Sequence, residues 1–292
     1  MSNKKQTGET DFQRFYRIRE GASVFVSEQL INELPQKEVN NVTIKFVQKY
    51  LPFDRFVDSI VNKYFYLSAP SAWGDPFETK YLDVLGNPQM YRIPQESVAE
   101  LKDMHIFCTC MTFNDSDNEE ASWKSYGDTD EVVRVSYDFD KLCEALSVES
   151  IYVGKIVYKP RNIILNPTPV FNSNTDIKDN AVLLVNNLCY KQDAYEYEKE
   201  LRFCKIKRGD EFKEIKGCKA LDIDLSSAIF QITLPPIKFL NDEEKKVKLL
   251  EQMKKYSLLK QICPQAKIFI SNLYDSSKES MITEYDINTI EL

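Results

Sequence analysis

Glu198, Glu200 and Arg202 lie at alternate positions within the segment 195–203, which reads YEYEKELRF. In a β-strand, alternate side chains share one face, so Glu198, Glu200 and Arg202 would point the same way. Neighbouring carboxylates repel each other unless a cation or a shared proton offsets the repulsion. A carboxylate in such an environment is suited to acid, base or hydroxyl-binding chemistry. The spacing predicts a catalytic pair, Glu198 and Glu200, with Arg202 beside it as a ligand-binding residue.

The same three charges also have a purely structural interpretation. A strand with one charged outer face commonly carries an arginine that neutralises neighbouring glutamates, and such ion pairs need no ligand. Taken alone, the segment favours this interpretation over a catalytic one. Both stay open, because the choice depends on where the fold places the strand.

Scarce residue types exclude several classes of enzyme. The chain has one histidine, His105, so a histidine-rich metal centre is excluded, and a serine–histidine or cysteine–histidine mechanism would have to use that residue. His105 falls in the apolar run 104–111, which predicts a buried strand and a core histidine. Only eight glycines are present, and the sequence contains no phosphate-binding loop of the Rossmann or P-loop type.

The seven cysteines include no Cys-x-x-Cys pair, and several lie in apolar, strand-like runs. This pattern is typical of buried thiols in a reducing compartment. Cys108 and Cys110 would share a strand face, but a zinc site needs four ligands and no further soft ligand lies nearby. We therefore predict no metal site.

Length and charge indicate a globular protein. The 292 residues, 43% of them hydrophobic, are enough to bury a large core, and the net charge of -7 argues against nucleic acid as a non-specific partner. Residues 1–11 are polar, and no apolar run approaches the ~20 residues of a membrane span. We expect a cytoplasmic protein without a membrane partner, whose candidate partners are a nucleotide, another small molecule or a protein.

Hydrophobic periodicity divides the chain into two parts. Apolar residues between 12 and 34 recur at helix-compatible spacing before Pro35, so 1–49 is predicted to be a polar tail and helical extension. Residues 50–292 alternate strands with helices, and their connections are too short for a regular βαβ pattern. This part predicts a single α+β domain, with a mixed, largely antiparallel sheet and flanking helices.

The last helix of that domain has clear limits in the sequence. Asn241 fits its N-cap, and the helix is expected over 242–259. Apolar residues at helical spacing predict a stripe that faces the core, formed by Val247, Leu250, Met253 and Tyr256.

A turn before another expected helix places two more acids beside aromatic residues. Asp75 fits the N-cap, Pro76 the first helical position, and Glu78 the position that reaches back to the cap. The cap explains both acids, yet a loop with two carboxylates is also a place where a ligand can bind. Further along, a short helical turn brings Trp123 and Tyr126 to one side. We keep these four residues, Asp75, Glu78, Trp123 and Tyr126, as candidate ligand-binding residues.

Five short motifs follow one another along the chain: Tyr66-Leu67-Ser68-Ala69-Pro70 with Gly74-Asp75-Pro76-Phe77-Glu78; Cys110-Met111-Thr112 with Ser122-Trp123-Lys124-Ser125-Tyr126; Ile156-Val157-Tyr158; Lys191 with Tyr195, Tyr197, Glu198, Glu200 and Arg202; and a strand ending near Ser271. In this order, over roughly residues 50–275, they resemble the bacterial domain-of-unknown-function family two-nine-seven-one. The resemblance implies that Lys191 and Tyr195 belong to the ligand-binding set.

Three positions depart from the family pattern. Gly74 stands where the family has Asn, Tyr195 where it has Trp, and Glu131 opens a strand that is glycine-rich in the family. If these positions bind a ligand in relatives, binding would be altered in this chain.

The family name implies no activity, so the expected chemistry comes from a similarity to ADP-ribosyltransferase-like folds. These use an aromatic residue, histidine or arginine on an early strand, a serine or threonine on a second, and a glutamate on a late strand, often within Glu-x-Glu. This chain offers Tyr50, Ser68 and Glu198-x-Glu200 in that order. The similarity implies a transferase or another NAD-consuming enzyme, in which a glutamate holds a ribose hydroxyl and stabilises positive charge as nicotinamide leaves.

Two other hypotheses stay open. The chain could be a non-catalytic nucleotide- or protein-binding module in defence or stress response, with stacking by Trp123, Tyr126 and Tyr195. It could also hydrolyse a phosphodiester or glycosidic bond with the acids at 75, 78 and 200. Convergence of the candidate residues around one site favours an enzyme, and dispersal favours the binding module.

Overall fold

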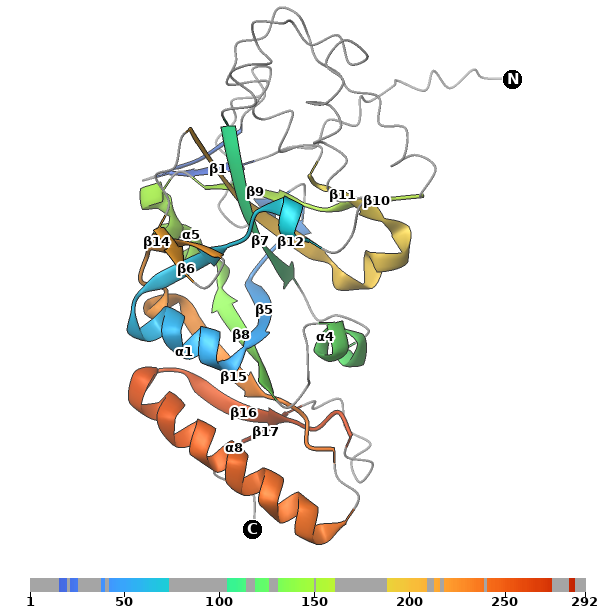
Figure 1. The fold of residues 1–292 in the computed structure, drawn as a ribbon. Coiled ribbons are helices and arrows are strands. Elements are labelled where there is room, and N and C mark those ends of the chain that lie inside the picture. Colours follow the sequence, from blue (N-terminus) through green and yellow to red (C-terminus); the bar gives the residue numbers. More distant parts are fainter. Residues whose placement is uncertain are drawn as a thin grey trace, which may run out of the picture.

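A ten-stranded sheet forms the centre of the fold (Figure 1). The computed structural model describes residues 16–19, 22–25, 38–39, 42–73, 104–113, 119–125, 131–149, 151–160, 188–208, 213–215, 218–238, 241–274 and 284–286. The strand order is β17 (Glu284–Asp286), β16 (Lys267–Ser271), β15 (Ile229–Leu234), β8 (Val132–Asp138), β5 (Phe46–Pro52), β7 (Met104–Phe113), β12 (Glu200–Arg208), β9 (Tyr152–Lys155), β1 (Tyr16–Arg19) and β2 (Ala22–Phe25). Among the described strands of this sheet, only β15 and β16 pair in parallel, so the predicted mixed, largely antiparallel sheet is confirmed.

Smaller sheets complete the described strands. They are β13 (Lys213–Ile215), β14 (Cys218–Asp222) and β6 (Tyr64–Leu67) in one; β10 (Val157–Lys159) and β11 (Tyr190–Gln192) in another; and β3 (Glu38–Val39) with β4 (Val42–Thr43). An isolated bridge between Ser68 and Cys108 ties the end of β6 to β7, with two backbone hydrogen bonds of 2.8 Å. This bridge brings the segment after β6 to the central strands.

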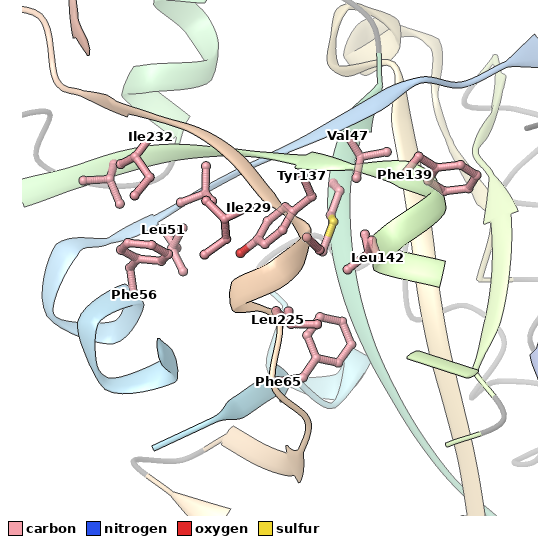
Figure 2. Packing of buried hydrophobic residues seen from close by; sticks show 14 of the residues in the cluster. Val47, Leu51, Phe56, Phe65, Tyr137, Phe139, Leu142, Leu225, Ile229 and Ile232 are labelled. Carbon is pink, nitrogen blue, oxygen red and sulfur yellow. The ribbon is translucent and has the colours of Figure 1, made fainter. Parts of the chain in front are cut away.

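One face of the large sheet carries the hydrophobic core. Every second residue of the central strands points to this face, including Val47, Val135 and Leu201, which are fully buried. The covering elements are α1 (Phe53–Val61), α5 (Phe139–Leu146), α8 (Asp242–Ile262) and the short 3₁₀ helix η5 (Ser226–Ala228). A second short 3₁₀ helix, η3 (Ser147–Glu149), follows α5 and has no buried residue. Figure 2 shows Phe56 from α1 and Leu142 from α5 among the core side chains.

The opposite face of the sheet is largely polar, apart from an apolar cluster of Tyr50, Val132 and Trp123. It carries side chains such as Gln48 on β5, Ser136 on β8 and Thr112 on β7, which are in register with one another. The helix α4 (Glu119–Ser125) lies on this side, across the strands from α1 (Figure 1). The same strands therefore present an apolar face to one set of helices and a polar face to other elements.

The predicted cap of α8 is confirmed, and the predicted stripe is confirmed for two of its four residues and wrong for the other two. Asn241 accepts a hydrogen bond from the Glu244 amide at 2.9 Å. Val247 and Leu250 are each 53% exposed, whereas the buried residues are Leu249, Gln252 and Leu259. Met253 and Tyr256 are partly buried against the core. Two helical phases fit the apolar residues of this helix, and packing against the sheet selects the other one.

The N-terminal prediction is also wrong where the structure describes it. Within 12–50, the described segments form β-strands, among them β1 and β2, and β5 crosses the boundary expected at residues 49 and 50. Short runs of apolar residues fit a helix and a strand equally well, and here β1 is a strand because it pairs with β9.

The prediction of a buried His105 is wrong as well, because the structure places this residue at the surface. Among the described residues, no helix is both long enough and apolar enough to cross a membrane.

Candidate functional site

The acidic segment folds differently from the single strand that its sequence predicts. Residues Asp193–Glu198 form the 3₁₀ helix η4, and β12 begins only at Glu200. Lys199 separates the two and adopts a left-handed conformation with φ of 43°. A left-handed conformation is uncommon for a residue with a Cβ atom, because it brings that atom too close to the backbone. Glu198 and Glu200 are therefore brought together by a tight turn and not by strand alternation.

A single lysine binds both carboxylates. Lys191 Nζ lies 2.6 Å from Glu198 Oε2 and 3.2 Å from Glu200 Oε2. Arg202 holds the other oxygen of Glu200, with Nε at 3.0 Å and Nη2 at 2.7 Å from Oε1. Arg202 also donates a hydrogen bond to the carbonyl of Leu188. Lys191, Glu198, Glu200 and Arg202 thus form one buried ion-pair network.

Burial differs between the two glutamates. The side chain of Glu198 is 15% exposed, and that of Glu200 is 4% exposed. Burial alone would raise the pKa of Glu200, but the charges of Arg202 and Lys191 outweigh it and lower the pKa to about 2. Glu200 is therefore ionised at neutral pH and cannot donate a proton. Glu198 is the more exposed of the two carboxylates.

Aromatic side chains flank both cations. The guanidinium of Arg202 lies 4.4 Å from the centre of the Trp73 ring, and Lys191 Nζ lies 5.0 Å from the centre of the Tyr195 ring. Trp73 Nε1 donates a hydrogen bond of 2.9 Å to Ser68 Oγ. Through Trp73, which follows the 3₁₀ helix η1 (Pro70–Ala72), the candidate residue Ser68 joins the site.

A tyrosine from β10 contributes a further contact to the network. The amide of Glu200 donates a hydrogen bond of 2.9 Å to the hydroxyl oxygen of Tyr158. Burial and the nearby Glu200 carboxylate both raise the pKa of Tyr158, so its hydroxyl stays neutral. The sequence alone does not indicate Trp73 or Tyr158 as site residues, because Trp73 contacts Arg202 and Tyr158 contacts Glu200, and both contacts join positions far apart along the chain.

Thr112 stands directly opposite Glu200 in the register of β7 and β12. Its side chain is 4% exposed, and its Oγ1 has no hydrogen-bond partner within the described part of the chain. The register extends the polar row across neighbouring strands, in the order Gln231, Ser136, Gln48, Thr112 and Glu200. A buried hydroxyl with no partner is rare, so Thr112 is the unsatisfied polar group of this row.

The remaining candidates do not join this network in the described structure. Trp123 is fully buried in a second cluster with Tyr50 and Val132, where its ring meets that of Tyr50 edge to face at 5.0 Å. It therefore presents no open face to a ligand. The candidates Asp75, Glu78 and Tyr126, and the departure at Gly74, lie outside the described residues. Glu131, the other departure, is exposed beside β8.

The structure and the comparisons leave the site to be interpreted from its own chemistry. Among the described side chains, no group of three or more metal-binding residues comes together. No family model matches the chain, and neither a curated protein nor a solved structure matches it. The resemblance to family two-nine-seven-one stays a prediction. The network offers two carboxylates, each paired with a cation, and a charged carboxylate can bind hydroxyl groups and stabilise positive charge.

Proposed function

We propose that the chain is an NAD-consuming enzyme of the ADP-ribosyltransferase type, with Glu198 as the residue that contacts the ribose. The observation that carries the proposal is the left-handed Lys199, which turns Glu198 and Glu200 toward the same ammonium group. Backbone strain of this kind costs of order 1 kcal/mol or more and is concentrated at functional sites.

The two glutamates would have different roles. Glu198 is the more exposed of the two, so it is the better candidate to accept a hydrogen bond from a ribose hydroxyl. When the bond between the ribose and nicotinamide breaks, its electron pair leaves with nicotinamide, and a nearby carboxylate stabilises the positive charge left on the ribose. Water or an acceptor group then attacks the ribose carbon that was bonded to nicotinamide. Glu200, which is held by Arg202, would be a positioning residue that fixes Lys191 and so Glu198.

The charge of Glu200 supports its role as a positioning residue. Its pKa is lowered to about 2, so it stays ionised at neutral pH and keeps its contact with Lys191, the ammonium group that also binds Glu198. The role requires no proton transfer from Glu200.

A second candidate function has its own observation. Each glutamate already has a cationic partner, and Arg202 is fully buried, so the network also satisfies itself. That favours the alternative in which the chain is a non-catalytic nucleotide- or protein-binding module and the ion pairs are structural. NAD binding without nicotinamide release would support this alternative.

The test is incubation of the purified chain with NAD, with chromatography of the released nicotinamide. We expect Glu198→Gln to lower the rate of release at least about 100-fold, in the range seen when a group that stabilises transition-state charge is removed. Glu149→Gln is the matched control, because Glu149 is also paired with a lysine of β12, at 2.9 Å from Lys205 Nζ. The Glu149→Gln variant should release nicotinamide at a rate within about twofold of the native rate, because it removes no group that stabilises charge in the proposed reaction.

Two results would contradict the proposal. One is the absence of nicotinamide release together with no NAD-dependent shift of the melting temperature of the native chain. The other is a Glu198→Gln variant that is as active as the native chain. The melting temperature of each variant, measured without NAD, separates a loss of chemistry from a loss of folded protein.

A further inference from the structure

Two cysteines of the polar face lie against each other in the centre of the sheet. Cys108 on β7 and Cys204 on β12 are directly opposite in the antiparallel register. Their sulfur atoms are 3.1 Å apart, and both side chains are fully buried. Directly opposite residues of antiparallel strands have Cα atoms about 4.5–5.5 Å apart, which falls within the range of about 4.4–6.8 Å found in disulfides. The backbone therefore already has the separation that a disulfide needs.

The surroundings connect this pair to the candidate site. Cys204 follows Arg202 by two residues on the same strand face, and Cys108 is bridged through its backbone to Ser68. Cys110, two residues from Cys108 on that face, is partly exposed, so the polar side of β7 is open to small solutes at that position. A bond between the two cysteines would join β7 to β12 beside the residues that hold Glu200.

We propose that Cys108 and Cys204 form a redox modification site, at which a small peroxide converts the two thiols into a disulfide that links β7 and β12. In the reaction with hydrogen peroxide, the two thiols lose two electrons and two protons, one sulfur–sulfur bond forms, and the peroxide is reduced to two water molecules. This proposal is independent of the NAD chemistry, since it needs neither NAD nor the glutamates.

Burial sets the rate of this reaction. It raises the pKa of the Cys108 thiol, so little of the reactive thiolate is present at neutral pH. Oxidation is therefore slower than that of an exposed thiol. The same burial shields the finished disulfide from reductants, so the modification records prolonged exposure to oxidant and does not switch rapidly.

The experiment counts free thiols in the whole chain. The reduced protein is incubated with hydrogen peroxide, the peroxide is removed, and the chain is unfolded in the presence of N-ethylmaleimide for measurement of the intact mass. The reduced chain has seven cysteines, so seven labels are expected before oxidation and five after it. Digestion without reductant should yield a peptide that links Cys108 to Cys204.

Single substitutions provide the controls. Cys108→Ser and Cys204→Ser should each keep all six of their remaining thiols free, whereas Cys143→Ser, which removes another buried thiol, should still lose two labels on oxidation. A cysteine-containing peptide treated in parallel shows when oxidation by the peroxide is complete. Under those conditions, a native chain that still takes up seven labels would overturn the proposal. So would a disulfide that joins any other two cysteines. If a serine variant fails to fold, the linked peptide of the native chain decides.

Discussion

On β12, Leu201 and Phe203 face the hydrophobic core, whereas Glu200 and Arg202 face the polar side, and all four are at most 3% exposed. The core face is buried because its side chains are apolar, so removal from water is favourable by itself. The polar face can be buried only because each charge has partners: Glu200 has Arg202 and Lys191, and Arg202 also has the Leu188 carbonyl. The stability of the polar face thus depends on complete pairing, and loss of one partner has a larger effect than loss of a few methyl groups.

Arg202→Met tests the polar face most severely. The substitution leaves one cation, Lys191, for the two carboxylates of Glu198 and Glu200, so one buried negative charge is no longer balanced. Removal of one partner from a buried ion pair destabilises a protein by about 3–5 kcal/mol. We expect a fall of about 4 kcal/mol in the free energy of unfolding, measured by urea denaturation. Adding Glu200→Gln should restore part of it, since the unpaired charge is then gone. A single variant as stable as the native chain would show that the face tolerates incomplete pairing.

Leu201→Ala tests the core face at the residue between the two charges. Leu201 is fully buried, and truncation of a buried leucine lowers the free energy of unfolding by about 3 kcal/mol. Phe230→Ala is the control, because Phe230 is 37% exposed, and its loss should be clearly smaller. Urea denaturation of both variants measures the difference. Equal losses would contradict the assignment of the core to the Leu201 face.

Acid should weaken the polar face before it affects the core. The pKa of Glu200 is about 2 in the folded chain, below its ordinary value of 4.5, so its stabilisation is complete above pH 4.5 and is lost as the pH falls toward 2. A downward shift of this size corresponds to on the order of 3 kcal/mol. The free energy of unfolding should therefore fall over this interval in the native chain, and less steeply in Glu200→Gln. Parallel pH curves for the two proteins would refute the assignment.

The smallest effect is expected at an ion pair that lies outside both buried faces. Lys63 Nζ lies 3.1 Å from Asp224 Oδ2, and the two side chains are 66% and 40% exposed. Water already solvates both charges, so Lys63→Met should change the free energy of unfolding by no more than about 0.5 kcal/mol. The same urea measurement, made at low and high salt, would reveal a larger contribution if one exists.

The strands of the central sheet could be predicted only in part from the sequence. The apolar run 104–111 predicts β7, whereas the apolar residues of β1 and β2 fit a helix equally well. The pairing of Glu198 and Glu200 was also predictable, but its cause was not. Strand alternation suggested it, whereas the structure achieves it through the left-handed Lys199, a conformation that the residue type does not signal. Trp73 and Thr112 could not be assigned to the site from the sequence, since their partners lie far away along the chain.

The polar row from Gln231 to Glu200 takes one residue from each of five adjacent strands. At a strand spacing of about 4.8 Å, the four steps between these strands amount to about 19 Å. A molecule aligned with this row would cross the strands at right angles and meet each of them at a single position. Recognition of such a molecule would leave no contiguous signature in the sequence, and only the register of the sheet would encode it.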